Sequence, residues 1–198
     1  MTQSCNPVRL VVFDMDGTIT RPHLDFRRIR AEIGIPEPLL ENMMALPPGP
    51  ERERAFAILE RHEDDAAEKS ELNGDARGIL ELLRARGVRT ALVTRNSRRS
   101  ALRVLEKHAL AFDLVVTRED APVKPRPEPL WLICERLGVP PAEALMVGDY
   151  KYDVISGRAA GLRTALLLQG DRLPPYLDEV RPDHLLRRLE DLPALFPS

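Results

Sequence analysis

The sequence has little of what marks several classes of protein. Only two cysteines, Cys5 and Cys134, occur in 198 residues, without the spacing of a metal site. This indicates a reducing compartment and no disulfide framework. No stretch reaches the ~20 apolar residues that a membrane span needs, and residues 1–9 lack the apolar run of a signal peptide. We therefore expect a cytoplasmic protein that has no membrane partner.

The chain also lacks a large excess of charge of either sign. The chain has 29 Lys and Arg against 31 Asp and Glu, a net charge of −2. Because there is no basic excess, nucleic acid is not an expected partner. The remaining composition, 43% hydrophobic and 30% charged, is that of an ordinary folded globular protein. Its length allows one domain, or one domain with a small insert.

Short apolar runs alternate with amphipathic helical patterns along most of the chain. Each run is almost continuously apolar, as in strands buried on both faces of a parallel sheet. This alternation predicts a doubly wound α/β fold of the Rossmann-like kind. The predicted strands are Val8–Phe13, Val88–Val93, Leu114–Val116, Ala144–Val147 and Thr164–Leu168.

One region interrupts the alternation. Between about Thr20 and Asn73 the pattern predicts three helices and no strand, the third with a strongly charged outer face. We therefore expect residues 1–19 and 74–198 to form the α/β domain and residues 20–73 to form an all-helical insert. The last apolar run, His184–Leu186, is interpreted as structural.

The first predicted strand ends in a pair of acids. Asp14 and Asp16 leave it in the sequence Asp14-Met15-Asp16-Gly17-Thr18. Ligands bind at the carboxyl edge of an open parallel sheet, and carboxylate oxygens suit Mg²⁺. In isolation, however, such a motif can also be an ordinary turn at the end of a strand.

The next two features offer groups for an anion. Thr94 and Arg95 follow the second strand, where a hydroxyl and the free N–H groups of a helix N-terminus can bind phosphate. Helix capping is the alternative role for Thr94. Lys124 stands in a proline-rich loop before a helix and could neutralise a carboxylate and a phosphate together. Its alternative is a surface lysine.

The fourth feature is Gly148-Asp149-Tyr150-Lys151-Tyr152-Asp153. Asp149 ends a strand, and Asp153 follows about one helical turn later, so both carboxylates can point to the same place. Asp153 could instead simply cap the helix.

All four features stand at predicted strand ends, so the fold would gather them at one edge. Gathered acids repel one another unless a divalent cation and a lysine offset their charge. This combination fits phosphoryl transfer.

Taken in order, these four motifs resemble the haloacid dehalogenase superfamily, and the helical insert resembles the small cap of its phosphoglycolate phosphatase-like subgroup. The resemblance implies a Mg²⁺-dependent phosphatase that hydrolyses a small phosphorylated metabolite through an aspartyl-phosphate. It implies that Asp14 is the nucleophile and that Asp16 is the general acid and base. Within that superfamily, an acid at the position of Asp16 implies phosphate esters as substrates and not halides or phosphonates.

The resemblance also assigns the remaining residues. Asp14, the carbonyl of Asp16 and Asp149 would hold Mg²⁺, with Asp153 orienting that group of ligands. Thr94 and Lys124 would contact phosphate and Lys124 would steady Asp14, while Arg95 is a further candidate phosphate contact. The sequence leaves open a phosphomutase acting on a sugar phosphate, or a catalytically silent phosphate-binding module. Either a monomer or a homodimer is compatible with it.

Overall fold

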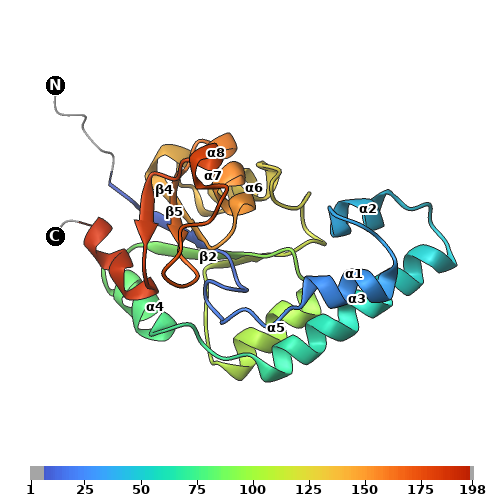
Figure 1. Ribbon diagram of the computed structural model, residues 1–198. Coiled ribbons are helices and arrows are strands. Elements are labelled where there is room, and N and C mark those ends of the chain that lie inside the picture. Colours follow the sequence, from blue (N-terminus) through green and yellow to red (C-terminus); the bar gives the residue numbers. More distant parts are fainter. Residues whose placement is uncertain (1–6, 197–198) are drawn as a thin grey trace.

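A six-stranded, fully parallel sheet forms the centre of the protein in the computed structural model, which describes residues 7–196 (Figure 1). The strand order is β3-β2-β1-β4-β5-β6. The doubly wound α/β prediction is therefore confirmed. The strands are β1 (Leu10–Phe13), β2 (Arg89–Val93), β3 (Leu114–Val116), β4 (Ala144–Gly148), β5 (Arg163–Leu167) and β6 (His184–Leu186).

All five predicted strands are present, with ends shifted by up to two residues. The run at His184–Leu186 adds β6 at the edge of the sheet, beside β5. The strands alternate between two apolar layers. Val11 and Phe13 of β1 pack into one hydrophobic cluster, whereas Leu10 and Val12 pack into another on the opposite face.

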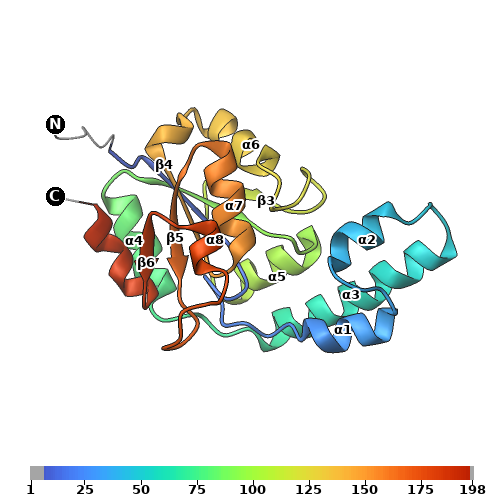
Figure 2. The ribbon, with the colours of Figure 1, turned by 45° about the horizontal axis from the view of Figure 1, so that its top comes forward.

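Helices cover both faces of the sheet (Figure 2). One cluster includes apolar residues of α4 (Ala76–Ala85), α5 (Arg98–Lys107) and the 3₁₀ helix η2 (Leu189–Leu195). The other includes residues of α6 (Glu128–Leu137) and α7 (Lys151–Ala160). Cys134 is buried in this second cluster, whereas Cys5 lies outside the described residues. Two short helices, η1 (Pro141–Glu143) and α8 (Leu177–Val180), complete the α/β part.

The segment between β1 and α4 is helical, as predicted. It contains α1 (Phe26–Ile33), α2 (Leu39–Ala45) and α3 (Pro50–Lys69), which project to one side of the sheet (Figure 2). These helices share a hydrophobic cluster that includes Ile29, Met43 and Leu59. The far end of α3 also packs on the main domain, because Ala67 belongs to the larger cluster. A domain division at residues 20–73 remains a prediction.

The helices of residues 7–196 are all too short or too polar to cross a lipid bilayer.

Candidate active site

Neighbouring strands bring distant acids together at the carboxyl edge of the sheet. β1 and β4 are paired in register, with Phe13 opposite Val147, so Asp14 and Asp149 leave adjacent strands at the same edge. The N–H of Asp14 donates to the carbonyl of Val147 at 2.9 Å, which extends this register one residue past the strand. Asp153 reaches the same point from the first turn of α7. The predicted convergence of these three acids is therefore observed.

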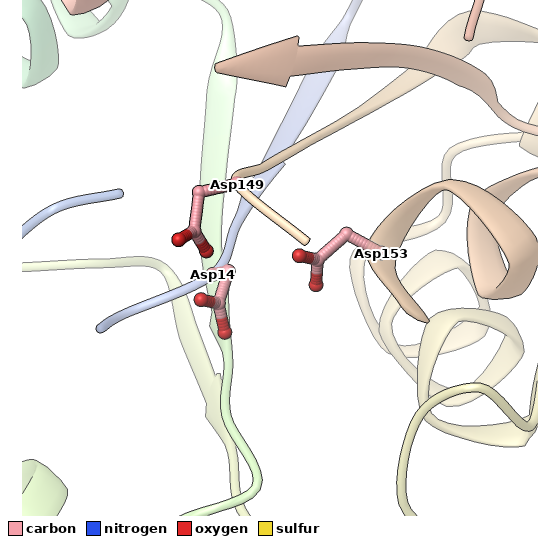
Figure 3. A group of neighbouring side chains, drawn as sticks. All are labelled: Asp14, Asp149 and Asp153. Atoms are coloured by element: carbon pink, nitrogen blue, oxygen red, sulfur yellow. The ribbon is translucent and has the colours of Figure 1, made fainter. Parts of the chain in front are cut away.

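The three carboxylates form one compact group (Figure 3). One oxygen from each of Asp14, Asp149 and Asp153 lies within 4.8 Å of the other two. Asp153 is 3% exposed, and its Oδ2 accepts a hydrogen bond of 3.0 Å from the N–H of Tyr150. Asp153 therefore does cap α7, and it serves the acidic group as well. Carboxylate oxygens arranged in this way are suitable ligands for a hard divalent cation.

Lys124 is buried among these acids and is not a surface lysine. Its side chain is 3% exposed. The Nζ atom donates to Asp14 Oδ1 at 2.5 Å, to Asp153 Oδ1 at 2.6 Å and to the carbonyl of Val93 at 3.2 Å. All three protons of the ammonium therefore have acceptors. The lysine joins the nucleophile predicted on β1 to the acid on α7.

The electrostatics of the group show a need for positive charge. Burial raises the pKa of Asp14 to about 7, although Lys124 lowers it. Burial also raises the pKa of Asp149 to about 8, and the charges of Asp14 and Asp153 add to the rise. Burial lowers the pKa of Lys124, but attraction to its two carboxylate partners prevails and raises it overall. One lysine does not balance three carboxylates, so the group fits a divalent cation.

The turn after β1 is shaped to lie against this group. Gly17 has a φ of +84°, and a Cβ at this position would lie 2.1 Å from Asp149 Oδ2. Any other residue would therefore be strained and would collide with the carboxylate. The carbonyl of Gly17 accepts hydrogen bonds from Gln169 at 2.6 Å and Asn73 at 3.2 Å. These contacts hold the turn that carries Asp16.

Asp16 has a partner that the sequence analysis missed. Asn96 is 6% exposed, and its Nδ2 donates to Asp16 Oδ2 at 2.6 Å. Burial raises the pKa of Asp16 to about 6, while the bond from Asn96 opposes the rise. The only sequence signal for Asn96 is its place two residues after Thr94 at a strand end. The direction of its side chain could not be read from that.

The side chains of Thr94 and Arg95 have different partners in the structure. Thr94 is 4% exposed, and its Oγ1 accepts a hydrogen bond of 3.1 Å from the N–H of Asn96. Ser97 caps α5 by accepting a hydrogen bond from the N–H of Ser100. Arg95 turns toward the helical insert, where its guanidinium binds Glu41 of α2. The phosphate-binding roles predicted for Thr94 and Arg95 remain predictions.

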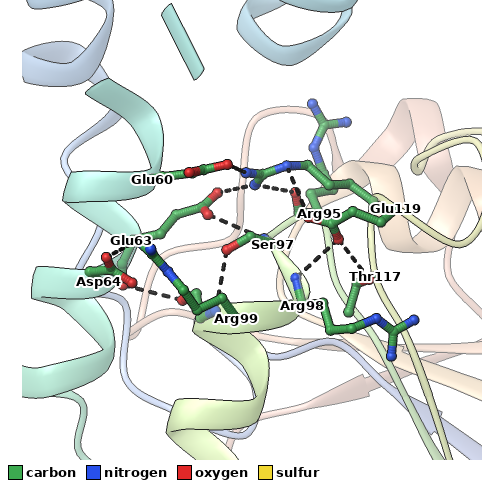
Figure 4. Close-up of polar contacts among 11 residues, drawn as sticks. Glu60, Glu63, Asp64, Arg95, Ser97, Arg98, Arg99, Thr117 and Glu119 are labelled. Carbon is green, nitrogen blue, oxygen red and sulfur yellow. Dashed lines mark hydrogen bonds and ion pairs between the residues drawn. The ribbon is translucent and has the colours of Figure 1, made fainter. Parts of the chain in front are cut away.

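A buried ion pair connects α3 to the loop that follows β3. Glu63 lies within what the pattern indicated to be a charged outer face, yet it is 1% exposed and its carboxylate binds Arg118. Its second oxygen accepts from the N–H of Ser97 at 3.1 Å (Figure 4). Glu63 therefore fixes α3 to the start of α5. The helical period of α3 alone could not show this, because the partner follows β3 far along the chain.

A cavity of about 440 Å³ lies between the acidic group and the helical insert. Its lining includes Asp14, Asp16, Lys124, Asp149 and Asp153 on the α/β side, and residues of α1, α2 and α3 on the other side. A ligand bound to the acidic group would therefore also contact the insert.

The chain matches known proteins over most of its length. The family of haloacid dehalogenase-like hydrolases matches residues 8–161. A haloacid dehalogenase-like hydrolase domain-containing protein of Arabidopsis thaliana is 30% identical over 188 residues, covering 88% of this chain and 76% of that protein. The pyrophosphatase PpaX of Halalkalibacterium halodurans is 30% identical over 208 residues, covering 93% of this chain and 95% of that protein.

The fold has matches among solved structures. That of a predicted phosphoglycolate phosphatase from Haemophilus somnus superposes with a TM-score of 0.72, at 20% identity, covering 95% of this chain and 97% of the other. At this identity the match shows the fold. The resemblance found in the four sequence motifs is thus confirmed: the chain belongs to the haloacid dehalogenase-like hydrolase family.

Proposed function

We propose that this protein is a Mg²⁺-dependent phosphatase that hydrolyses small phosphate monoesters through an aspartyl-phosphate on Asp14. One observation carries the proposal. Asp14, Asp149 and Asp153 offer oxygens within 4.8 Å of one another, and Lys124 lies 2.5 Å from Asp14. This is the arrangement needed to hold a cation and a phosphate against a carboxylate nucleophile.

In the first step, a carboxylate oxygen of Asp14 attacks the phosphorus atom and the bond to the ester oxygen breaks. The leaving oxygen takes a proton from Asp16. In the second step, water attacks the phosphorus of the aspartyl-phosphate and gives its proton to Asp16. The products are the alcohol, inorganic phosphate and the free Asp14 carboxylate, so atoms and charges balance.

Asp16 is suited to both halves of this cycle. Burial raises its pKa to about 6, close enough to neutrality for the carboxyl group to give up a proton and regain it. The hydrogen bond from Asn96 holds one of its oxygens, which fixes the orientation of the other. Asp14 differs in that Lys124 binds it directly. This contact opposes the effect of burial, which raises the pKa of Asp14 to about 7.

Mg²⁺ would be held by Asp14, Asp149 and the carbonyl of Asp16, with Asp153 supporting these ligands, and it would shield the anionic phosphate from the anionic nucleophile. One oxygen of each of Asp14, Asp149 and Asp153 lies within 4.8 Å of the other two, which supports a shared hard cation.

The remaining residues would bind and enclose the substrate. Thr94 and the N–H groups at the start of α5 are candidate donors to phosphate oxygens. Arg95 would join them only on leaving its contact with Glu41. Lys124 would neutralise both Asp14 and a bound phosphate. Residues 20–73 act as a cap, because α1, α2 and α3 line the cavity above the acidic group. The pyrophosphatase relative supports a phosphate-containing substrate.

The test is phosphate release from a panel of phosphate monoesters, with and without Mg²⁺, compared with the D14N variant. We expect release by the wild type with Mg²⁺ and none by D14N. Acid-quenched wild type should carry one phosphoryl group by intact-protein mass spectrometry. Release by D14N at the wild-type rate would disprove the mechanism. A requirement for a sugar bisphosphate activator would indicate a phosphomutase instead.

A further inference from the structure

The cavity joins a charged end to a mostly apolar end. Its lining on the side of the helical insert includes Leu24, Phe26, Leu39, Leu40 and Leu59, together with Arg30, Glu37 and Glu63. Phe26 is 49% exposed, which leaves much of an aromatic ring open to a bound molecule. A phosphate bound at Asp14 would thus place its leaving group against a mainly apolar wall.

Arg95 lines this cavity and follows Thr94 at the predicted phosphate site. Its guanidinium is already paired with the carboxylate of Glu41. Its Nη1 lies 2.8 Å from Glu41 Oε1 and its Nη2 lies 3.0 Å from Glu41 Oε2, a two-point contact with a carboxylate of α2. The guanidinium also lies over the Tyr152 ring, 4.9 Å from its centroid, and Nη1 donates to the carbonyl of Lys124. Burial raises the pKa of Glu41, but its bonds with Arg95 prevail and lower it overall. Glu41 is therefore an ionised partner.

The other cations of the cavity are matched as well. Arg30 of α1 lies 2.6 Å from Glu37, and Lys124 is shared between Asp14 and Asp153. Within residues 7–196, the lining of the cavity thus holds no lysine or arginine without a carboxylate partner. A second anionic group on a substrate would have to displace one of these carboxylates and would also meet the charge of the one it displaced.

We propose that Glu41 is a specificity-determining residue: by occupying Arg95, it selects phosphate monoesters whose leaving group is uncharged and largely apolar, against those with a carboxylate or second phosphate. This inference rests on the proposed phosphatase function and narrows its substrate class. The ion pair rejects anions, and the apolar wall favours the accepted group. Pyrophosphate and phosphoglycolate are then poor substrates, although proteins named for them share this fold.

The test compares kcat/KM for propyl phosphate, benzyl phosphate, phosphoglycolate and pyrophosphate with Mg²⁺. The wild type should favour the first two by at least tenfold. E41Q keeps the size of the side chain but frees the Arg95 charge. This variant should raise the ratio of kcat/KM for phosphoglycolate to kcat/KM for propyl phosphate at least tenfold. E143Q, which removes a surface partner of Arg9 far along the chain, is the matched control and should leave the ratio unchanged.

A preference of the wild type for either anionic substrate, or an unchanged ratio in a folded E41Q, would overturn the inference while leaving the phosphatase proposal intact. A second measurement does not depend on turnover. Calorimetry on D14N and on D14N/E41Q should show propyl phosphate binding more tightly than phosphoglycolate to the first, with a smaller difference for the second. If no ester is hydrolysed but this pattern holds, the phosphatase proposal fails and the selectivity remains. Absence of the pattern overturns the selectivity.

Discussion

Asn96 Nδ2 lies 2.6 Å from Asp16 Oδ2, joining a loop after β2 to the turn after β1 across 80 positions of sequence. The bond is partly buried, and it holds the carboxyl group that we assign as general acid and base. Its loss leaves that group free to rotate away from the leaving oxygen. Hydrogen bonds to a charged group are worth about 1.5–3 kcal/mol.

N96A should therefore slow hydrolysis of an alkyl phosphate by about tenfold or more, because the poor leaving group needs a positioned acid. p-Nitrophenyl phosphate should be affected less, because its leaving group departs without a proton. Steady-state kinetics on both esters check this. N42A, which removes an amide that bonds Pro36 on the insert, is the control. An equal loss on both esters would mean that Asn96 does not act through Asp16.

Removing Lys124 should be costly both for stability and for activity. K124M leaves Asp14 and Asp153 buried without their shared cation, and breaking a buried pair costs about 3–5 kcal/mol. Urea unfolding without metal measures the loss. K69M, at an exposed ion pair with Asp65, should change the free energy of unfolding little. K124M as stable as the wild type would contradict the role given to this lysine.

Magnesium should stabilise the folded protein. An ion that binds only the native state adds about 2.7 kcal/mol when its concentration is 100 times its Kd. Thermal unfolding with increasing Mg²⁺ should therefore show a rising Tm in the wild type and a much smaller rise in D149N. Chelation should abolish phosphate release, and D153N should need more Mg²⁺ for the same rate. A Tm independent of Mg²⁺ would argue against a site among these carboxylates.

The buried pair of Glu63 and Arg118 should respond asymmetrically to mutation. Burial raises the pKa of Glu63, and attraction to Arg118 offsets only part of that rise. We therefore expect a neutral side chain at position 63 to be tolerated. R118M instead leaves a carboxylate that is 1% exposed without its partner, at a cost of about 3–5 kcal/mol. E63Q should cost much less, and E63Q/R118M should recover most of the loss of R118M.

The same pair predicts a dependence of stability on pH. Where the folded pKa of Glu63 lies above its unfolded value, the native state binds more protons than the unfolded state. The free energy of unfolding of R118M should therefore fall as the pH rises above the ordinary glutamate pKa of 4.5. In E63Q/R118M this extra fall should be absent. Chemical unfolding at a series of pH values decides the point, and parallel curves for the two variants would refute it.

Much of the architecture could be predicted, because it depends on local pattern. Near-continuous apolar runs are required where a parallel strand is covered on both faces, and β1 has Val11 and Phe13 on one face and Leu10 and Val12 on the other. The edge strand β6 was harder to assign, because its three residues begin with a polar histidine, unlike the wholly apolar three-residue strand β3. The helices of the insert were visible from their apolar spacing.

The sequence by itself determined the strand-and-helix alternation, the insert and the acids that follow β1 and β4, because these depend on residues close in the chain. The tertiary structure decided the partners. Asn96 meets Asp16, Glu63 meets Arg118, and Glu41 meets Arg95 only through the packing of elements far apart in sequence. No local period encodes such pairs, since their energy comes from burial and charge matching that exist only after the chain has folded.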